Sequence, residues 1–381
     1  MNFNYRNTTQ LYFTKEISHD INNFIESNNF KKILIITGGA STEQYAKIIS
    51  NSISVENTII SGVVSNPLSE TVEKMANIAK DYNPDLILTV GGGSVHDTGK
   101  AVAIMFYDSE NTIEDYTVTG KLSVPGIKKA LPVITVPTIL GSGAEVSPAS
   151  LLRIGNEKRV IFSPLLHPLA SFINIDWSKS LNKSMLARSA FDSFIQSLEG
   201  FVSTSANNIS NAFAITSIEY YNDCLPALFD GYYSDDVIEK LAIASVFSSY
   251  VCSTASVGAI HAISDPISGR FDVHHGTALA MVATDVLKKN LSSICQDKIQ
   301  KIDSMLFNLN SEKTDVRERV IEKVVSIIEK QHLLQTITTK SITHQTLLCM
   351  VKESFNGDMV GNPYEFSENE IMDILGKWYE T

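Results

Sequence analysis

Three short apolar runs, each closed by glycine or proline, constrain the fold of this chain most strongly. The runs are Ile33–Ile36 before Gly38-Gly39, Leu86–Val90 before Gly91-Gly92-Gly93, and Val133–Val136 before Pro137. Continuous apolar runs of this length are typical of strands buried on both faces of a sheet. Helical patterns separate them, and alternating strands and helices predict a parallel sheet covered by helices. We therefore expect an α/β domain over residues 1–177.

The second half of the chain has a different pattern. From Ser184 onward glycine and proline become sparse, and apolar residues recur every three or four positions, as at Leu186, Ala190 and Phe194. This period predicts amphipathic helices, so residues 178–381 are expected to form an all-α domain. A chain of 381 residues is also longer than one hydrophobic core usually covers, which favours two domains.

Composition excludes several classes of partner. The net charge of −11 argues against nucleic acid, because phosphate backbones select basic surfaces. No apolar run approaches the ~20 residues that span a bilayer, and the amino terminus lacks the pattern of a signal peptide. The four cysteines show no CxxC spacing, which argues against a disulfide framework or a zinc ribbon. We expect a cytoplasmic protein without membrane or nucleic-acid partners.

The triple glycine carries the first ligand prediction. Gly91, Gly92 and Gly93 follow an expected strand and are followed by Ser94, a residue typical of helix N-caps, with Asp97 placed to complete a capping box. Glycines let an anion approach the backbone, and a helix amino terminus attracts phosphate. The pattern favours a dinucleotide pyrophosphate, although it is not GxGxxG. The alternative is a tight turn that binds nothing.

The loop after the first expected strand bears on the choice of cofactor. In dinucleotide-binding sheets an acid at this place commonly holds the ribose hydroxyls. Here the chain has Gly38, Gly39 and Ser41, and no acid before Glu43. The absence of a carboxylate permits a 2′-phosphate, so NADP(H) is favoured over NAD(H) within a Rossmann-like domain. The alternative is that these residues only begin a helix.

A second constellation predicts a metal site. His261 and His275 lie 14 residues apart in a glycine-punctuated stretch, and Asp192 and Gln196 share one face of an expected helix. One Asp and two His are a reasonable ligand set for Fe²⁺ or Zn²⁺, with Gln196 as a weak fourth ligand. Each residue alone is more often structural, and the pattern by itself leaves both interpretations open.

Five segments, taken in order, resemble the iron-containing (group III) alcohol dehydrogenase family, which shares its fold with glycerol dehydrogenase and dehydroquinate synthase. They are GGGSVHDTGKA at 91–101, PTILGSGAEVSP at 137–148, FDSFIQSLEGFVS at 191–203, GAIHAISDPISGRFDVHHG at 258–276 and NPYEFSENEIMDIL at 362–375. The resemblance implies that the glycines and Ser94 hold the pyrophosphate. It implies that Thr138 and Ser142 contact the cofactor and that Lys158 lies near its adenosine end. It also implies that Asp192, His261 and His275 bind the metal.

Two departures from the family pattern lie in the metal and substrate region. Gln196 stands where many members have a second histidine ligand, and an amide binds a transition metal more weakly than imidazole. Asp265 stands where members often have a histidine thought to pass protons. A carboxylate with a raised pKa can relay a proton, so we expect Asp265 to be catalytic. Both changes predict a weakly held or absent metal.

The resulting expectation is an NAD(P)-dependent homodimeric oxidoreductase that interconverts a small aldehyde or ketone and an alcohol, mainly by reduction. A divalent metal would polarise the substrate oxygen. One alternative is a relative of the same fold that has lost the metal, either a metal-independent reductase or a binding or regulatory protein that keeps the cofactor. Another is a dehydroquinate synthase-like lyase, which would need a basic phosphate pocket for which Arg159 and Arg270 are candidates.

Overall fold

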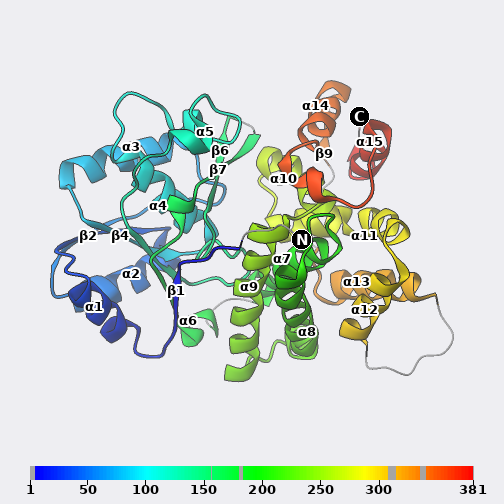
Figure 1. Cartoon of the computed structure of the whole chain (residues 1–381), viewed down its shortest axis with the longest axis horizontal. Coiled ribbons are helices and arrows are strands. Elements are labelled where there is room, and N and C mark those ends of the chain that lie inside the picture. The colour runs from blue at the N-terminus through cyan, green and yellow to red at the C-terminus, as the bar shows by residue number, and fades with distance from the viewer. Residues whose placement is uncertain (1–4, 156, 180–182, 308–314, 335–339, 381) are drawn as a thin grey trace. The chain divides into compact units, whose positions relative to one another are not determined.

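The computed structural model (Figure 1) describes residues 5–155, 157–179, 183–307, 315–334 and 340–380. The chain divides into two compact units. Arg6–Leu181 form one, and Asn182–Thr381 form the other together with Met1–Tyr5.

The first unit is built on a parallel sheet of six strands, as the buried apolar runs predict. Its spatial order is β1-β8-β5-β4-β2-β3, and every neighbouring pair is parallel. The strands are β1 (Gln10–Phe13), β2 (Lys32–Thr37), β3 (Glu56–Ile60), β4 (Leu86–Gly91), β5 (Val133–Pro137) and β8 (Ala170–Ile173).

Helices cover both faces of this sheet (Figure 1). Alternate residues of β2 divide between two cores, since successive side chains of a strand point to opposite faces. Ile33 and Ile35 pack with α1 and α2, whereas Leu34 and Ile36 pack with α3 and α4. The helices are α1 (Ile17–Ser27), α2 (Ala40–Ser52), α3 (Ser69–Tyr82), α4 (Gly93–Met105), α5 (Ser123–Gly126) and α6 (Ile175–Lys179). An antiparallel hairpin, β6 (Ala149–Ile154) and β7 (Glu157–Phe162), completes the unit.

The second unit is mostly helical. Its helices are α7 (Lys183–Val202), α8 (Asn208–Asp230), α9 (Asp235–Ala255), α10 (Ala259–Phe271), α11 (His275–Ser293), α12 (Gln296–Leu306), α13 (Val316–Lys330), α14 (His344–Glu353) and α15 (Glu368–Gly376). The expected all-α domain also contains a parallel pair of two-residue strands, β9 (Lys340–Ser341) and β10 (Tyr379–Glu380). Runs this short carry no detectable alternation in sequence.

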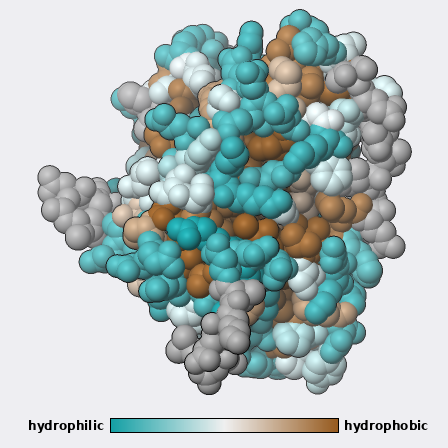
Figure 2. All heavy atoms as spheres, turned by 90° about the vertical axis from the view of Figure 1, so that its right-hand side faces the viewer, coloured by the Kyte–Doolittle hydropathy of each residue, from teal (hydrophilic) through white to brown (hydrophobic). Residues whose placement is uncertain are grey.

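One helix among the described residues, α9, is long and apolar enough to cross a membrane by length and composition. In its most apolar window 56% of the residues are buried inside the protein, and α9 packs on α7 and α8, as a core helix does. On the face shown in Figure 2, hydrophilic residues are interspersed with hydrophobic ones across the surface.

Candidate active site and metal centre

The strand order of the first unit creates a switch point between β2 and β4. The chain leaves β2 toward β3 on one side and leaves β4 toward β5 on the other. Ligands of open α/β sheets bind beyond the carboxyl ends of the strands at such a point. Gly38-Gly39 follow β2 and Gly92-Gly93 follow β4, so both glycine loops lie there.

The triple glycine begins α4 differently from the prediction. Gly92 is the N-cap and Gly93 is the first helical residue, with no side-chain cap, so the capping box assigned to Ser94 and Asp97 was wrong. The glycines are also required for packing. A β-carbon at Gly93 would lie 2.6 Å from Ser142 Oγ, which places the loop after β5 against the start of α4.

The structure places Thr138, which is predicted to contact the cofactor, at the same carboxyl edge of the sheet. Thr138 follows β5 directly, and its backbone N–H donates to the Gly91 carbonyl at 2.9 Å. The Thr138 hydroxyl is buried and has no hydrogen-bond partner among the residues that the structure describes. A buried hydroxyl without a partner is costly, so this oxygen is suited to a ligand atom.

The loop after β2 offers open space at one of its two glycines. A β-carbon at Gly38 would lie 2.9 Å from Thr42 Oγ1, which also accepts from the Gly38 N–H at 3.1 Å. Gly39, the N-cap of α2, has no atom within 4 Å of its β-carbon position. Ser41 is exposed in the first turn, and the nearest acid, Glu43, is ion-paired with Lys47 at 2.8 Å.

Asp97 lies inside α4 in a buried polar cluster. Burial raises its pKa to about 7, while the charges of Lys100 and Lys158 act in the opposite direction. Lys100 is fully buried and donates to the carbonyls of Ala144 and Ala149. The charge of Lys158 therefore acts on Asp97, and the role of both residues at the cofactor stays a prediction. Lys100, which the sequence interpretation did not single out, holds the loop that follows Ser142.

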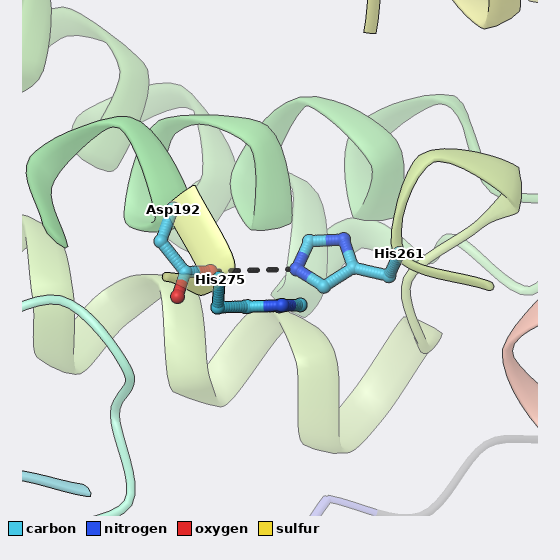
Figure 3. A group of neighbouring side chains, drawn as sticks. All are labelled: Asp192, His261 and His275. Atoms are coloured by element: carbon cyan, nitrogen blue, oxygen red, sulfur yellow. Dashed lines mark hydrogen bonds and ion pairs between the residues drawn. The ribbon is translucent and has the colours of Figure 1, made fainter. Parts of the chain in front are cut away.

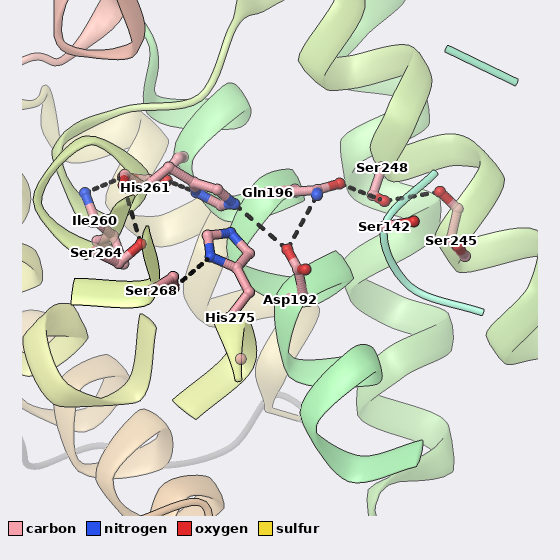
Figure 4. A network of polar contacts seen from close by, with 12 residues as sticks. Ser142, Asp192, Gln196, Ser245, Ser248, Ile260, His261, Ser264, Ser268 and His275 are labelled. Carbon is pink, nitrogen blue, oxygen red and sulfur yellow. Dashed lines mark hydrogen bonds and ion pairs between the residues drawn. The ribbon is translucent and has the colours of Figure 1, made fainter. Parts of the chain in front are cut away.

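The predicted metal ligands converge in the helical unit (Figures 3 and 4). Asp192 comes from α7, His261 from α10 and His275 from the start of α11. One ligand atom from each lies within 4.8 Å of those of the other two, and His261 Nε2 is 3.4 Å from Asp192 Oδ1. Asp192 and His261 are buried and His275 is partly buried.

A glycine lets α11 approach α7 at this point. A β-carbon at Gly276 would lie 2.3 Å from the Arg188 carbonyl oxygen, so any larger residue would push the helices apart. Gly276 follows His275 directly, and Arg188 precedes Asp192 by one turn. The close approach therefore brings these two ligands together. The residue that precedes His275, His274, is the N-cap of α11 and accepts from the Gly276 N–H.

Glu199 fixes the orientation of His261 and was missed in the sequence. It is 1% exposed, and its Oε2 lies 2.5 Å from His261 Nδ1. A carboxylate only accepts, so the Nδ1–H donates to Glu199 and Nε2 faces Asp192. Burial opposes charging, but hydrogen bonds to Asp192 and Glu199 raise the pKa of His261 to about 10. Asp192, Gln196 and Glu199 recur at i, i+4 and i+7, a helical spacing that contained the signal.

Gln196 and Ser268 support the ligands from either side (Figure 4). Gln196 Nε2 donates to Asp192 Oδ1 at 3.0 Å, and its Oε1 accepts from the Ser248 hydroxyl at 3.0 Å. Ser268 Oγ lies 3.4 Å from His275 Nδ1 and supports that ring. In this orientation Gln196 presents its amide nitrogen, rather than its oxygen, to the cluster.

The remaining predicted residues are placed as follows. Asp265 is half-buried on α10, one turn after His261. The two candidates for a phosphate pocket are both paired with acids: Arg270 with Glu353, and Arg159 with Glu114 and Glu157. Arginines already neutralised by carboxylates are poorly suited to a substrate phosphate, which disfavours the lyase alternative.

Known proteins similar to this chain include alcohol and hydroxyacid dehydrogenases by name. The chain is 25% identical over 361 residues to the NADPH-dependent butanol dehydrogenase of Clostridium saccharobutylicum, covering 91% of each protein. It is 27% identical over 324 residues to the 4-hydroxybutyrate dehydrogenase of Clostridium kluyveri, covering 83% of this chain and 84% of that protein.

An archaeal halo-thermophilic alcohol dehydrogenase from a Red Sea brine pool has the same fold, with a TM-score of 0.89 at 20% identity over 99% of both chains. Residues 8–175 match the family model of iron-containing alcohol dehydrogenase, and residues 186–379 match the model of that family's C-terminal part. The chain belongs to the iron-containing alcohol dehydrogenase family.

Proposed function

We propose that this protein is an NAD(P)-dependent oxidoreductase that reduces a small aldehyde or ketone to the alcohol with the help of a divalent metal. The observation that carries the proposal is the convergence of Asp192, His261 and His275, with Glu199 orienting one imidazole so that its Nε2 faces Asp192. Hydride transfer is the chemistry that the nicotinamide supplies.

The ligand set fits Fe²⁺ or Zn²⁺. Two imidazole nitrogens and a carboxylate form a three-ligand site of the kind that leaves a position open for substrate. When bound there, the metal would supply a Lewis acid that polarises the substrate oxygen. Asp192 and the two histidines hold it, and Glu199 keeps the proton of His261 on the nitrogen that faces away.

Gln196 is proposed as a weak fourth ligand through a turn of its amide. The Ser248 hydroxyl has one proton, yet it lies within donating distance of both Gln196 Oε1 and the Ser245 carbonyl. With the amide turned, Gln196 Nε2 would donate to Ser248 Oγ, whose proton then goes to Ser245. The Gln196 oxygen would then face Asp192, and Asp192 Oδ1 would lose the N–H donor of Gln196, so this orientation suits a site in which a metal ion lies between the two oxygens.

The cofactor is proposed to be NADP(H) in preference to NAD(H). Gly39 leaves open space at the start of α2, Ser41 is exposed beside it, and Lys47 neutralises the nearest acid. A helix amino terminus favours a phosphate, and the acid in the first turn of α2, Glu43, is paired with Lys47. The butanol dehydrogenase relative is itself named for NADPH.

Asp265 is proposed to carry the proton between substrate and solvent. It is half-buried on α10, four residues after His261, so the two side chains share one face of the helix. A partly exposed carboxyl one helical turn from a metal ligand can exchange protons with water.

We also propose that the enzyme is a cytoplasmic homodimer. All four cysteines are free, as is usual where thiols are kept reduced. Closed twofold dimers are the commonest assembly of soluble enzymes.

The test is oxidation of NADPH and NADH by the purified protein with a panel of short aldehydes, ketones and hydroxyaldehydes. We expect metal-dependent turnover with at least one of them, faster with NADPH. The absence of nicotinamide-linked turnover across the panel, with metal present, would contradict the proposal.

A further inference from the structure

We propose that Asn362, in the carboxyl-terminal NPYEF segment, is a positioning residue that holds the metal ligand His261 in place. The inference rests on the proposed metal site and assigns a role to a segment that the site itself does not use. The role comes from contacts at the start of α10, the helix that carries His261.

The first turn of α10 is capped by side chains from two distant parts of the chain. Asn362 Oδ1 accepts from the Ala259 N–H at 3.0 Å, and Glu199 Oε1 accepts from the Ile260 N–H at 2.6 Å. The N-cap residue, Gly258, has no side chain of its own to serve. A β-carbon there would lie 2.8 Å from Asn362 Oδ1 and 2.9 Å from Glu199 Oε1.

Asn362 also ties α10 to α11, the helix that begins with His275. Its amide forms a reciprocal pair with Asn290 of α11, with Asn362 Nδ2 donating at 2.8 Å and Asn290 Nδ2 donating back at 2.9 Å. The second Asn362 Nδ2 hydrogen goes to the Tyr364 carbonyl at 2.7 Å. All four hydrogen-bonding positions of this amide are therefore used.

These contacts join the three helices that provide the metal ligands. Glu199 belongs to α7 with Asp192, Ala259 belongs to α10 with His261, and Asn290 belongs to α11 with His275. Asn362 is 7% exposed and Asn290 fully buried, so water does not replace lost bonds easily. Removing the Asn362 amide frees the start of α10 and the imidazole two residues after it.

The experiment measures metal affinity by competition with a chromogenic chelator, using Zn²⁺ and anaerobic Fe²⁺. Asn362→Ala should raise the metal Kd by about 10- to 100-fold, the range typical of residues that orient ligands. Saturating metal should restore most of kcat, because the ligands themselves remain.

Asn207→Ala is the matched control. Asn207 also caps a helix of the same unit, accepting from the Ile209 and Ser210 N–H groups at the start of α8, and touches no ligand-bearing helix start. It should lower thermal stability and leave the metal Kd within about twofold. Should Asn362→Ala not fold, Asn290→Ala removes the amide pair alone and should weaken metal binding to a smaller extent.

An unchanged Kd in Asn362→Ala, or an equal loss in Asn207→Ala, would overturn the inference. Failure of both Asn362→Ala and Asn290→Ala to fold would make the pair a folding element and overturn it as well. A wild-type protein that binds no metal would contradict the proposed function itself. A wild type and variants that bind metal equally well would contradict only the role of Asn362.

Discussion

Gly39→Asp should convert the cofactor preference from NADPH toward NADH. Gly39 is the N-cap of α2, its φ of −82° suits any residue, and a β-carbon there meets no atom within 4 Å. Aspartate is a good N-cap, so the folded protein should accept the change without loss of stability. Gly38 is a poorer choice, because the Thr42 hydroxyl occupies the place of its side chain.

The magnitude follows from Coulomb repulsion at an exposed site. Two unit charges 4 Å apart in water interact by about 1 kcal/mol, and a phosphate monoester carries nearly two negative charges. A new carboxylate at ~4–8 Å from the 2′-phosphate would then cost ~1–2 kcal/mol, or about 5- to 30-fold in NADPH Kd. NADH should bind more tightly, since the acid accepts from the ribose hydroxyl.

The assay is fluorescence titration of both cofactors at low and high salt, with Gly39→Asn as a neutral control of the same shape. The Asp variant should lose NADPH affinity relative to Asn, and added salt should shrink the difference. Equal NADPH affinity in the two variants, or a difference that salt leaves unchanged, would refute the assignment of this loop to the 2′-phosphate.

Three further predictions concern charge and protons. Metal binding to the wild type must displace a proton from His261, because the pKa of that imidazole is raised to about 10, so metal affinity should rise with pH through the neutral range. In Glu199→Gln the pKa of His261 falls. Isothermal titration in buffers of different ionisation heat should then show that the variant releases fewer protons on metal binding at neutral pH. Equal proton release would contradict the role of Glu199. Asp265→Asn should lower kcat by about 100-fold or more without changing the metal Kd, and an unchanged kcat would remove Asp265 from the proton path. Burial and the charge of Lys100 lower the pKa of His96 to about 3, so the folded protein excludes a proton that the unfolded chain binds below about pH 6.5, and stability is lost on acidification. In denaturant unfolding, His96→Gln should reduce the dependence of the unfolding free energy on pH by roughly 1.4 kcal/mol per pH unit. The same pH dependence in the variant and the wild type would contradict this role of His96.

The parts of the fold that could be predicted are those with a strong local signal. Strands β2, β4 and β5 are mostly apolar and buried except for Lys32 at the start of β2, and each was expected within one residue of its observed bounds. The edge strand β1 is four residues long and partly exposed, and β8 is equally short, so neither stands out from its surroundings. The place of β1 in the sheet comes from pairing with β8, 160 positions away, and β8 itself also pairs with β5.

The residues of the candidate site also differ in how strong a local signal they carry in the sequence. Asp192, His261 and His275 were expected to converge because each is a ligand type within a recognisable motif, and the structure brings them together. Glu199 was missed although its helical spacing to Asp192 was visible. Asn362 could not be found at all, since its contact with Ala259 joins residues 103 positions apart and depends on how the helices pack.

The most direct test of the account is the metal requirement of turnover. The protein would be stripped with a chelator, analysed for residual metal, and assayed for NADPH-dependent aldehyde reduction before and after adding Fe²⁺ or Zn²⁺, alongside Asp192→Ala. We expect that the stripped protein is inactive and that added metal restores the activity of the wild type. Asp192→Ala should bind metal poorly and stay inactive after metal is added. Full turnover by the metal-free wild type would contradict it and identify a metal-independent reductase of the same fold.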